Sequence, residues 1–165
     1  MDYIDKALSM GAKNAARFGI DDIVFDSRVI LKCMFGCGDY GKLHTCPNQR
    51  SPLSMEEYEK IFKKYSWGII IGCGDKPTSQ KISYEIERLC FLDGHYFAFS
   101  LSDCGLCKTC GKTDGVECRV PQKARPALHS VGIDVFKTVK NLGLPLGVLK
   151  DENDAQNWYS AVFIE

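Results

Sequence analysis

The hydrophobic and polar positions of this chain follow two patterns, and each predicts a different secondary structure. A continuous apolar run over residues 67–73 is typical of a strand that is buried on both faces, and the mainly apolar run over residues 96–101 predicts a second buried strand. The second of these runs ends just before Cys104, so the sheet is expected to lead directly into a cysteine-rich segment. Shorter apolar segments predict further strands: residues 23–25, 28–31, 145–149 and 158–164.

Stretches with apolar residues at helical spacing separate these runs and predict amphipathic helices. The first covers residues 2–18, with Gly19 at the position of a C-cap. A second helix is opened by Pro52 and Ser54 and runs to about residue 65, and Glu57 completes a capping box with Ser54. Three further helical segments are expected: residues 79–92 capped by Ser79, residues 125–131, and residues 134–141 capped by Asp134.

Strands that alternate with helices of this length predict an α/β fold. We expect a layered sheet with helices packed on it and with cysteine-rich loops at the strand ends. A chain of 165 residues can build one sizeable core, and no linker or repeat interrupts it. We therefore expect a single metal- or iron–sulfur-binding domain over residues 1–165.

Composition and charge limit the kinds of partner and the cellular compartment that the sequence predicts. The chain has 21 Lys and Arg against 21 Asp and Glu, so charge gives no reason to expect a nucleic acid or an anionic membrane as partner. No apolar run is long enough to span a bilayer, and no signal-peptide pattern is visible, so we expect a cytoplasmic protein. Nine cysteines in that reducing compartment favour metal ligation over disulfides.

Four cysteines late in the chain form what we call the second cysteine group: Cys104, Cys107, Cys110 and Cys118. The first three follow a Cys-x2-Cys-x2-Cys spacing, which is the spacing by which bacterial ferredoxins hold a [4Fe–4S] cluster. Structural zinc sites more often use two separate pairs, so the spacing favours iron–sulfur over zinc. The group departs from ferredoxins because seven residues separate its third and fourth cysteines, and Pro121 follows only later.

Three earlier cysteines form the first cysteine group: Cys33, Cys37 and Cys46. Three thiolates could hold a cluster with one iron left open, or a fourth ligand could come from His44, Cys73 or Cys90. Cys73 and Cys90 are interpreted more simply as buried core thiols, because free cysteine is among the most buried residue types.

Two further residues are candidates for contact with the cofactor. Tyr40, beside Gly41, either packs over a cluster or is an ordinary loop aromatic. Arg125 opens a predicted helix whose positive N-terminus could offset the charge of a thiolate-ligated cluster, and the alternative is a solvated arginine. Glu85 and Glu87 are interpreted as surface residues, with Glu85 able to pair with Arg88.

Taken together, these motifs resemble a family of cysteine-rich, predicted metal-binding proteins of unknown function that are common in anaerobic bacteria and archaea. The matching motifs are Cys33-x3-Cys37-x2-Tyr40-Gly41-x4-Cys46-Pro47, Glu85-x-Glu87-Arg88 with Gly94, the second cysteine group with Pro121 and Ala124-Arg125-Pro126, and Gly132-Ile133-Asp134-Val135. The chain departs from the family pattern at Asn48, Ala127 and His129. The resemblance implies metal or iron–sulfur binding and supplies no reaction.

The leading hypothesis is a cytoplasmic iron–sulfur protein with one or two [4Fe–4S] clusters that transfers electrons to a redox partner protein. The seven cysteines of the two groups would be its ligands, either group by group or in a crossed arrangement. One alternative is an enzyme in which an open iron of the first group acts as a Lewis acid. Another is a zinc-stabilised binding module.

Overall fold

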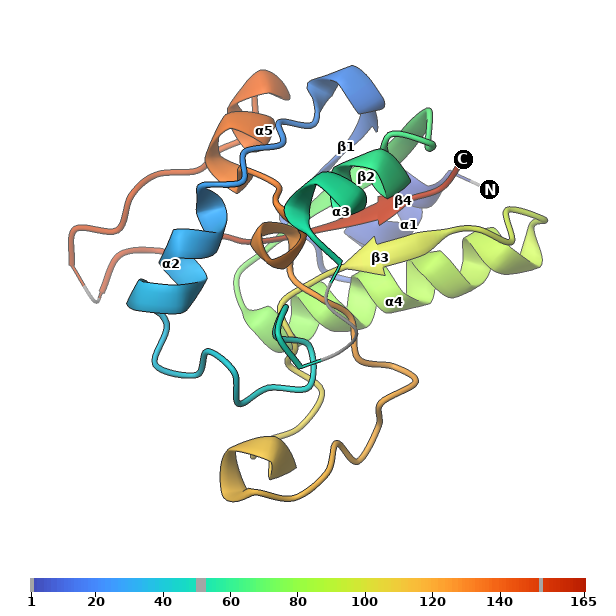
Figure 1. Ribbon diagram of the computed structural model, residues 1–165. Coiled ribbons are helices and arrows are strands. Elements are labelled where there is room, and N and C mark those ends of the chain that lie inside the picture. The colour runs from blue at the N-terminus through green and yellow to red at the C-terminus, as the bar shows by residue number, and fades with distance from the viewer. Residues whose placement is uncertain (1, 50–52, 152) are drawn as a thin grey trace.

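A four-stranded antiparallel sheet lies at the centre of the protein, in the strand order β1–β2–β4–β3 (Figure 1). The computed structural model describes residues 2–49, 53–151 and 153–165. The strands are β1 (Asn14–Gly19), β2 (Trp67–Cys73), β3 (Phe99–Leu101) and β4 (Trp158–Phe163). The last strand of the chain therefore lies between β2 and β3, and it makes the sheet continuous.

Among the described residues, five α-helices and three short 3₁₀ turns connect and cover the strands. The helices are α1 (Tyr3–Ser9), α2 (Val29–Gly36), α3 (Met55–Phe62), α4 (Lys76–Leu92) and α5 (Val135–Asn141). The 3₁₀ turns are η1 (Ile20–Asp22), η2 (Gly111–Asp114) and η3 (Leu128–Val131). In the part of the chain that the structure describes, no helix has both the length and the apolar character needed to cross a bilayer.

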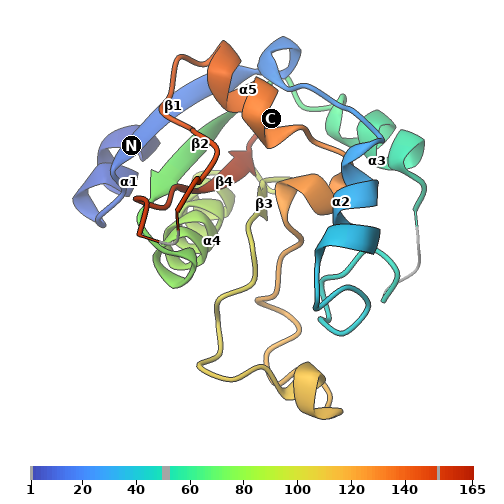
Figure 2. The same ribbon diagram turned by 90° about the vertical axis from the view of Figure 1, so that its left-hand side faces the viewer.

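The sheet is buried on both faces because β2 and β4 carry apolar residues at consecutive positions. Ile70 points into one core with Phe18 and Phe163, where α3, α5 and η3 pack. Ile69 and Ile71 point into a second core that α1 and α4 cover. Figures 1 and 2 show these helices on opposite sides of the sheet. The expected layered α/β fold is confirmed, and every pair of neighbouring strands is antiparallel.

Several predicted elements are confirmed. The strands at residues 67–73 and 158–164 are β2 and β4, and the capping box of Ser54 and Glu57 begins α3. Pro52 lies outside the described residues. Asp134 caps α5 through the backbone N–H of Lys137. The helix expected from Ser79 begins earlier, at Lys76, because the Asp75 side chain accepts the Thr78 N–H.

The expectation of one helix over residues 2–18 is wrong, because the segment divides into α1 and β1. The backbone at Gly11 has a φ of 105°, which favours glycine and ends the helical segment. Residues 14–19 then pair with residues 67–72 of β2. The small apolar residues of this stretch fit helical and strand periodicity alike, so pairing with β2 decides the structure.

Four other expected elements also differ. Residues 28–31 lie at the start of α2 rather than in a strand, and residues 23–25 contribute a single bridge, from Phe25 to Ile133. The strand over residues 96–101 shortens to β3. Residues 145–149 form a loop, and the helix expected from residue 125 is only the turn η3, which starts at Leu128.

Both cysteine groups lie at one end of the molecule. Residues 103–126 form a long loop between β3 and η3, and residues 37–48 form a second loop after α2 (Figures 1 and 2). The long loop leaves a strand, as expected, whereas the first group begins on a helix. Side chains from both loops line one cavity of about 240 Å³, so the loops are neighbours.

Candidate metal centre

The second cysteine group lies on a loop whose two ends are joined. The backbone N–H of Ser102 donates to the Pro126 carbonyl at 2.8 Å, which closes the base of the loop. Between Cys110 and Cys118 the chain folds into η2, and Gly115 leaves this turn with a φ of 77°. The long gap before the fourth cysteine is therefore a compact turn, after which the chain returns toward the base of the loop.

Cys104 is the most firmly positioned member of this group. The next residue, Gly105, donates its N–H to the Oε1 atom of Gln80 on α4. A Cβ atom at Gly105 would lie 2.9 Å from the Pro77 backbone, so the loop approaches the first turn of α4 as closely as glycine allows. The cysteine run therefore begins at a fixed point on the surface of α4.

Electrostatics indicates which cysteines of this group are neighbours. Burial is the main cause that raises the pKa of the Cys104 thiol, and the charges of Cys110 and Cys118 raise it further. The backbone of Leu106 and the side chain of Gln80 act in the opposite direction. Cys110 and Cys118 therefore each lie within electrostatic reach of Cys104.

The first cysteine group combines a buried thiol with exposed ones. Cys33 on α2 is only 6% exposed, Cys37 follows the end of the helix and is exposed, and Cys46 is half-buried. Burial is the main cause that raises the pKa of Cys33, followed by the charges of Cys37, Cys46 and Asp103. Since Asp103 immediately precedes Cys104, the first group lies beside the start of the long loop.

These groupings stop short of a formed coordination site. Across residues 2–49, 53–151 and 153–165, no three Cys, His, Asp or Glu side chains are arranged so that they could hold one metal ion. The predicted ligands are gathered into two neighbouring loops without converging on a common point. Coordination of one ion by three of them would require the loops to close.

The candidates for a fourth ligand have different surroundings. Cys73 and Cys90 are fully buried in the core between the sheet and the two helices α1 and α4. Burial raises the pKa of each thiol to about 11, so both are protonated near neutral pH. His44 lies with Cys46 on the wall of the cavity between the two loops.

Arg125 is engaged by a partner that the sequence pattern did not indicate. Its guanidinium forms a two-pronged ion pair with Glu87, with N–O distances of 2.5 and 2.9 Å, and both side chains are less than 15% exposed. Glu87 also accepts hydrogen bonds from the backbone N–H and the hydroxyl of Ser100. The pair thus ties the returning end of the long loop to α4 and β3.

This arrangement corrects two expectations. Glu87 is a buried ion-pair partner and not a surface residue, whereas Glu85 pairs with Arg88 as expected, at 2.8 Å. Arg125 precedes η3 and begins no helix, so the expected helix N-terminus does not lie there. The contact of Arg125 with a cofactor stays a prediction, as does that of Tyr40, which lies half-buried in the first loop.

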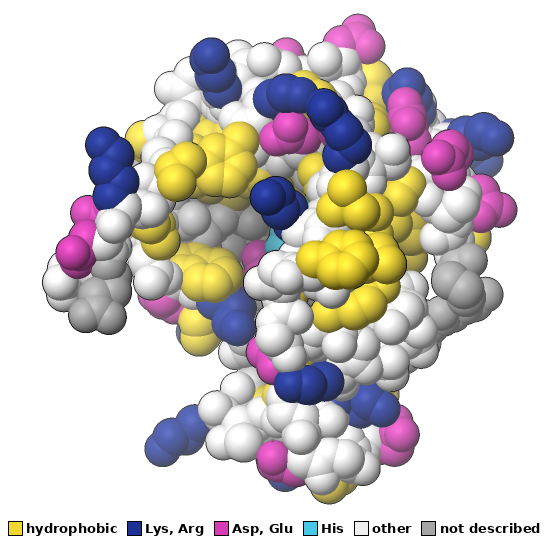
Figure 3. Space-filling view, turned by 60° about the vertical axis from the view of Figure 1, so that its left-hand side comes forward, with side chains coloured by type: hydrophobic (Ala, Val, Ile, Leu, Met, Phe, Trp, Pro, Cys, Tyr) yellow, Lys and Arg dark blue, Asp and Glu magenta, His cyan; other side chains and the backbone are white. Residues whose placement is uncertain are grey.

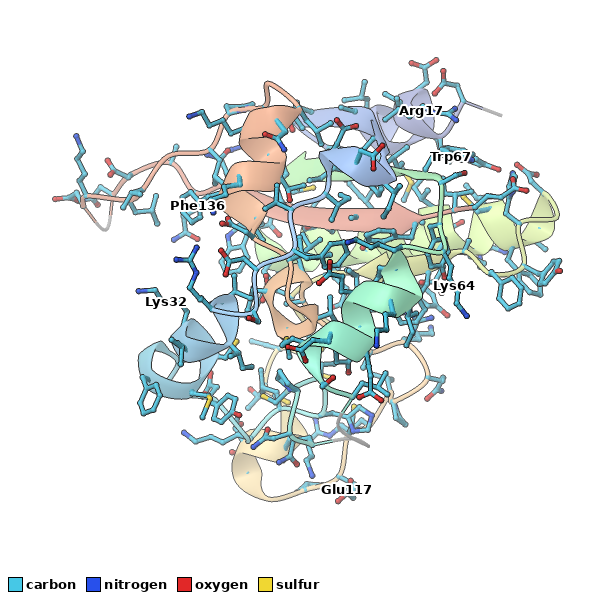
Figure 4. The ribbon with its side chains drawn as sticks, turned by 45° about the horizontal axis from the view of Figure 1, so that its top comes forward. Arg17, Lys32, Lys64, Trp67, Glu117 and Phe136 are labelled. Atoms are coloured by element: carbon cyan, nitrogen blue, oxygen red, sulfur yellow. The ribbon has the colours of Figure 1, made fainter. Side chains whose placement is uncertain are left out.

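An open cavity of about 630 Å³ adjoins the first group, and sequence reasoning missed it. Cys33, Cys37 and Asp103 line it on one side, and apolar residues of α5 and of the loop before β4 line the other. Figure 3 shows a hollow bordered by hydrophobic side chains on this side of the molecule. Lys32 and Phe136, both lining residues, lie on the same side of the molecule in Figure 4. The only related signal was the apolar run at residues 145–149, which supplies part of the wall.

The comparisons with known proteins agree with a metal-binding role. The model of one family, described as "Predicted metal-binding protein (DUF2284)", matches residues 16–164, which include both cysteine groups. Neither a curated protein nor a solved structure matches the chain. Because the family model covers most of the sequence, this chain belongs to the DUF2284 family of predicted metal-binding proteins.

Proposed function

We propose that this protein is a cytoplasmic iron–sulfur protein that carries one or two [4Fe–4S] clusters and transfers electrons to a redox partner protein. The observation that carries the proposal is the second cysteine group. Four cysteines share one loop that is closed at its base, with η2 folded between the third and the fourth. Their Cys-x2-Cys-x2-Cys spacing favours iron–sulfur over zinc.

The residues around this group suit a thiolate-bound centre. Cys104, Cys107, Cys110 and Cys118 would hold it, and Cys33, Cys37 and Cys46 would hold a second cluster or share ligands with the first. A cluster of this kind supplies one-electron transfer at a potential set by charge, hydrogen bonds to sulfur and exposure. The nitrogen of the buried Gln80 amide has no hydrogen-bond partner among the described residues, and it fits the need for a donor beside a thiolate.

Binding of metal and ordering of the loops are coupled in this proposal. The cysteines lie in two neighbouring loops, but no three of them among the described residues are close enough to hold one metal ion. Coordination would therefore draw the two loops toward each other. The closed base and the Arg125–Glu87 pair limit how far the long loop has to move. Metal binding then contributes directly to the stability of this end of the molecule.

The surface around the first group supports transfer to a partner protein. Phe35 is 83% exposed, and it lies two residues before the exposed Cys37. Leu31 and Met34, on the same helix, are also exposed. Large apolar side chains at the surface are typical of sites where another protein packs, and here they lie beside a candidate ligand.

Anaerobic purification followed by iron, sulfide and zinc analysis tests the proposal, with an EPR spectrum of the reduced protein to count clusters. We expect a coloured protein with about four iron and four sulfide per cluster. A colourless protein with stoichiometric zinc would contradict it and would support the zinc-stabilised module instead.

A second candidate function is an enzyme, and the cavity beside Cys33 and Cys37 favours it. A group of only three cysteines leaves a coordination position that a substrate in the cavity could use. EPR spectra of the reduced protein with and without cyanide separate the two functions. A spectrum that changes with cyanide supports an open iron position, whereas identical spectra support electron transfer alone.

A further inference from the structure

Gln80 is a polar side chain in an unusual place. It lies in the second turn of α4 and is only 1% exposed. A buried amide is costly unless its polar atoms have partners. Its Oε1 atom accepts the N–H of Gly105, but its Nε2 atom is buried and has no hydrogen-bond partner among the residues that the structure describes.

The orientation of this amide follows from its one partner. The backbone N–H of Gly105 can only donate, so the side-chain oxygen of Gln80 must face it. The NH₂ group is thereby held on the other side of the amide, and it can only donate. A donor fixed in this way needs an acceptor.

The acceptor that the surroundings offer is the sulfur of Cys104, the residue before Gly105. Because the amide oxygen accepts the N–H of Gly105, the unpartnered amide nitrogen also lies beside Gly105 and close to the residue that precedes it. Gly105 packs against Pro77 without room for a Cβ atom, so the backbone of the residue after Cys104 is held close to the N-terminal end of the same helix. The unpaired Nε2 donor is therefore held beside the start of the cysteine run.

We propose that Gln80 is a positioning residue of the metal centre, whose Nε2–H donates to the Cys104 thiolate and holds it ready as the first ligand. The inference rests on the proposed metal centre at the second cysteine group. Groups that hydrogen-bond to a metal ligand orient it and offset part of its charge, and their loss weakens metal binding. Such a bond at a cluster thiolate also raises the reduction potential, because it favours the more negative reduced state.

Two substitutions separate the donor from the rest of the side chain. Gln80→Glu keeps an oxygen for the Gly105 N–H and replaces the donor with a second acceptor that repels a thiolate. Gln80→Met removes both polar atoms and keeps a side chain of similar volume. It replaces Gln80→Glu in the test if the buried carboxylate of that variant prevents folding. Gln122→Glu adds the same charge at an exposed position of the long loop and is the matched control.

The experiment is an anaerobic Co²⁺ titration of the metal-free full-length chain, followed by the sulfur-to-cobalt absorption band. We expect Gln80→Glu to weaken Co²⁺ binding by about 10- to 100-fold. Gln80→Met should also weaken Co²⁺ binding. Gln122→Glu should stay within about twofold of wild type. Folded Gln80 variants that bind Co²⁺ as tightly as wild type would overturn the inference.

A second readout needs no metal and keeps the two proposals apart. The rate at which iodoacetamide alkylates Cys104 in the metal-free protein, measured by peptide mass spectrometry, follows its thiolate fraction. We expect Gln80→Glu to slow this rate by roughly threefold or more, because a higher pKa of Cys104 lowers its thiolate fraction and the greater nucleophilicity of the remaining thiolate offsets only part of that loss. If wild type binds no Co²⁺, the proposed metal centre fails, and the alkylation rates alone decide the role of Gln80. Equal rates in wild type and Gln80→Glu would contradict that role.

Discussion

The second cysteine group is held to the body of the protein by buried polar contacts, whereas the first group is partly open to solvent. Gln80 and the Arg125–Glu87 pair fix the two ends of the long loop against α4. The first group has one buried member, one exposed member and a cavity beside it. Similar cysteine motifs are thus set in different surroundings, one suited to holding a metal and the other to access by a partner or substrate.

The largest expected effect comes from breaking the ion pair at the base of the long loop. Arg125→Met leaves the Glu87 carboxylate buried without its partner, and we expect the free energy of unfolding to fall by about 3–5 kcal/mol in urea titrations. Arg28→Met is the matched control near the first group, because Arg28 is 77% exposed in its pair with Asp26. Its loss should cost no more than about 1 kcal/mol. Equal losses of unfolding free energy in Arg125→Met and Arg28→Met would contradict the claim that the second cysteine group is held more firmly than the first.

Removal of metal should loosen the long loop more than the first loop. If the proposed metal centre is filled in the protein as purified, chelation should speed tryptic cleavage after Lys108 or Lys112 by about tenfold or more. Cleavage after Lys42, in the first loop, should change less, because Cys37 there is already exposed. Mass spectrometry of early fragments measures both rates. A rate of long-loop cleavage that chelation does not change would contradict the coupling of metal binding to ordering of the loop.

A pair of glycine substitutions tests how tightly each loop is packed. At Gly105, a Cβ atom would lie 2.9 Å from the backbone of Pro77, so Gly105→Ala should cost about 1–3 kcal/mol of unfolding free energy. At Gly38, in the first loop, a Cβ atom would meet nothing within 4 Å. Gly38→Ala should therefore stay within about 0.5 kcal/mol of wild type by urea unfolding. A tolerated Gly105→Ala would show that the loop is not held against α4.

The smallest expected effect concerns the two core thiols at high pH. The pKa of Cys73 and of Cys90 is raised to about 11 from 9, so the folded state keeps these protons when the unfolded state has lost them. Stability is therefore fully present below pH 9 and declines as pH rises toward 11. Urea unfolding at pH 8 and pH 10 should show a decline that is smaller in Cys90→Ala. An identical pH dependence in wild type and Cys90→Ala would contradict a raised pKa of Cys90 in the folded state.

The sequence was sufficient for the parts of the fold that local pattern determines. Seven consecutive apolar residues at 67–73 require burial on both faces, and the side chains of β2 point into a core on each face of the sheet. The capping residues Ser54 and Asp134 satisfy helix N–H groups locally, so α3 and α5 begin where expected. Residues 14–19 could not be assigned in this way, because their pairing with β2 lies more than 45 residues away in the chain.

The cysteine groups could be predicted as groups, but their setting could not. Spacing identified the seven candidate ligands, and η2 explains the late position of Cys118. The partner of Arg125 lies 38 residues earlier, at Glu87, and no local signal joins them. From the sequence, Gln80 is indistinguishable from an ordinary helix residue, because nothing near it indicates that Gly105 packs against the start of the same helix.

The iron and sulfide content of Cys110→Ser, measured beside wild type and Cys90→Ala after anaerobic purification, tests the central claim most directly. Cys110 belongs to the second group, and Cys90 is a core thiol. We predict that Cys110→Ser loses about four iron atoms per chain relative to wild type, while Cys90→Ala loses none. A Cys110→Ser protein that keeps the iron and sulfide content of wild type would contradict the assignment of a cluster to this loop.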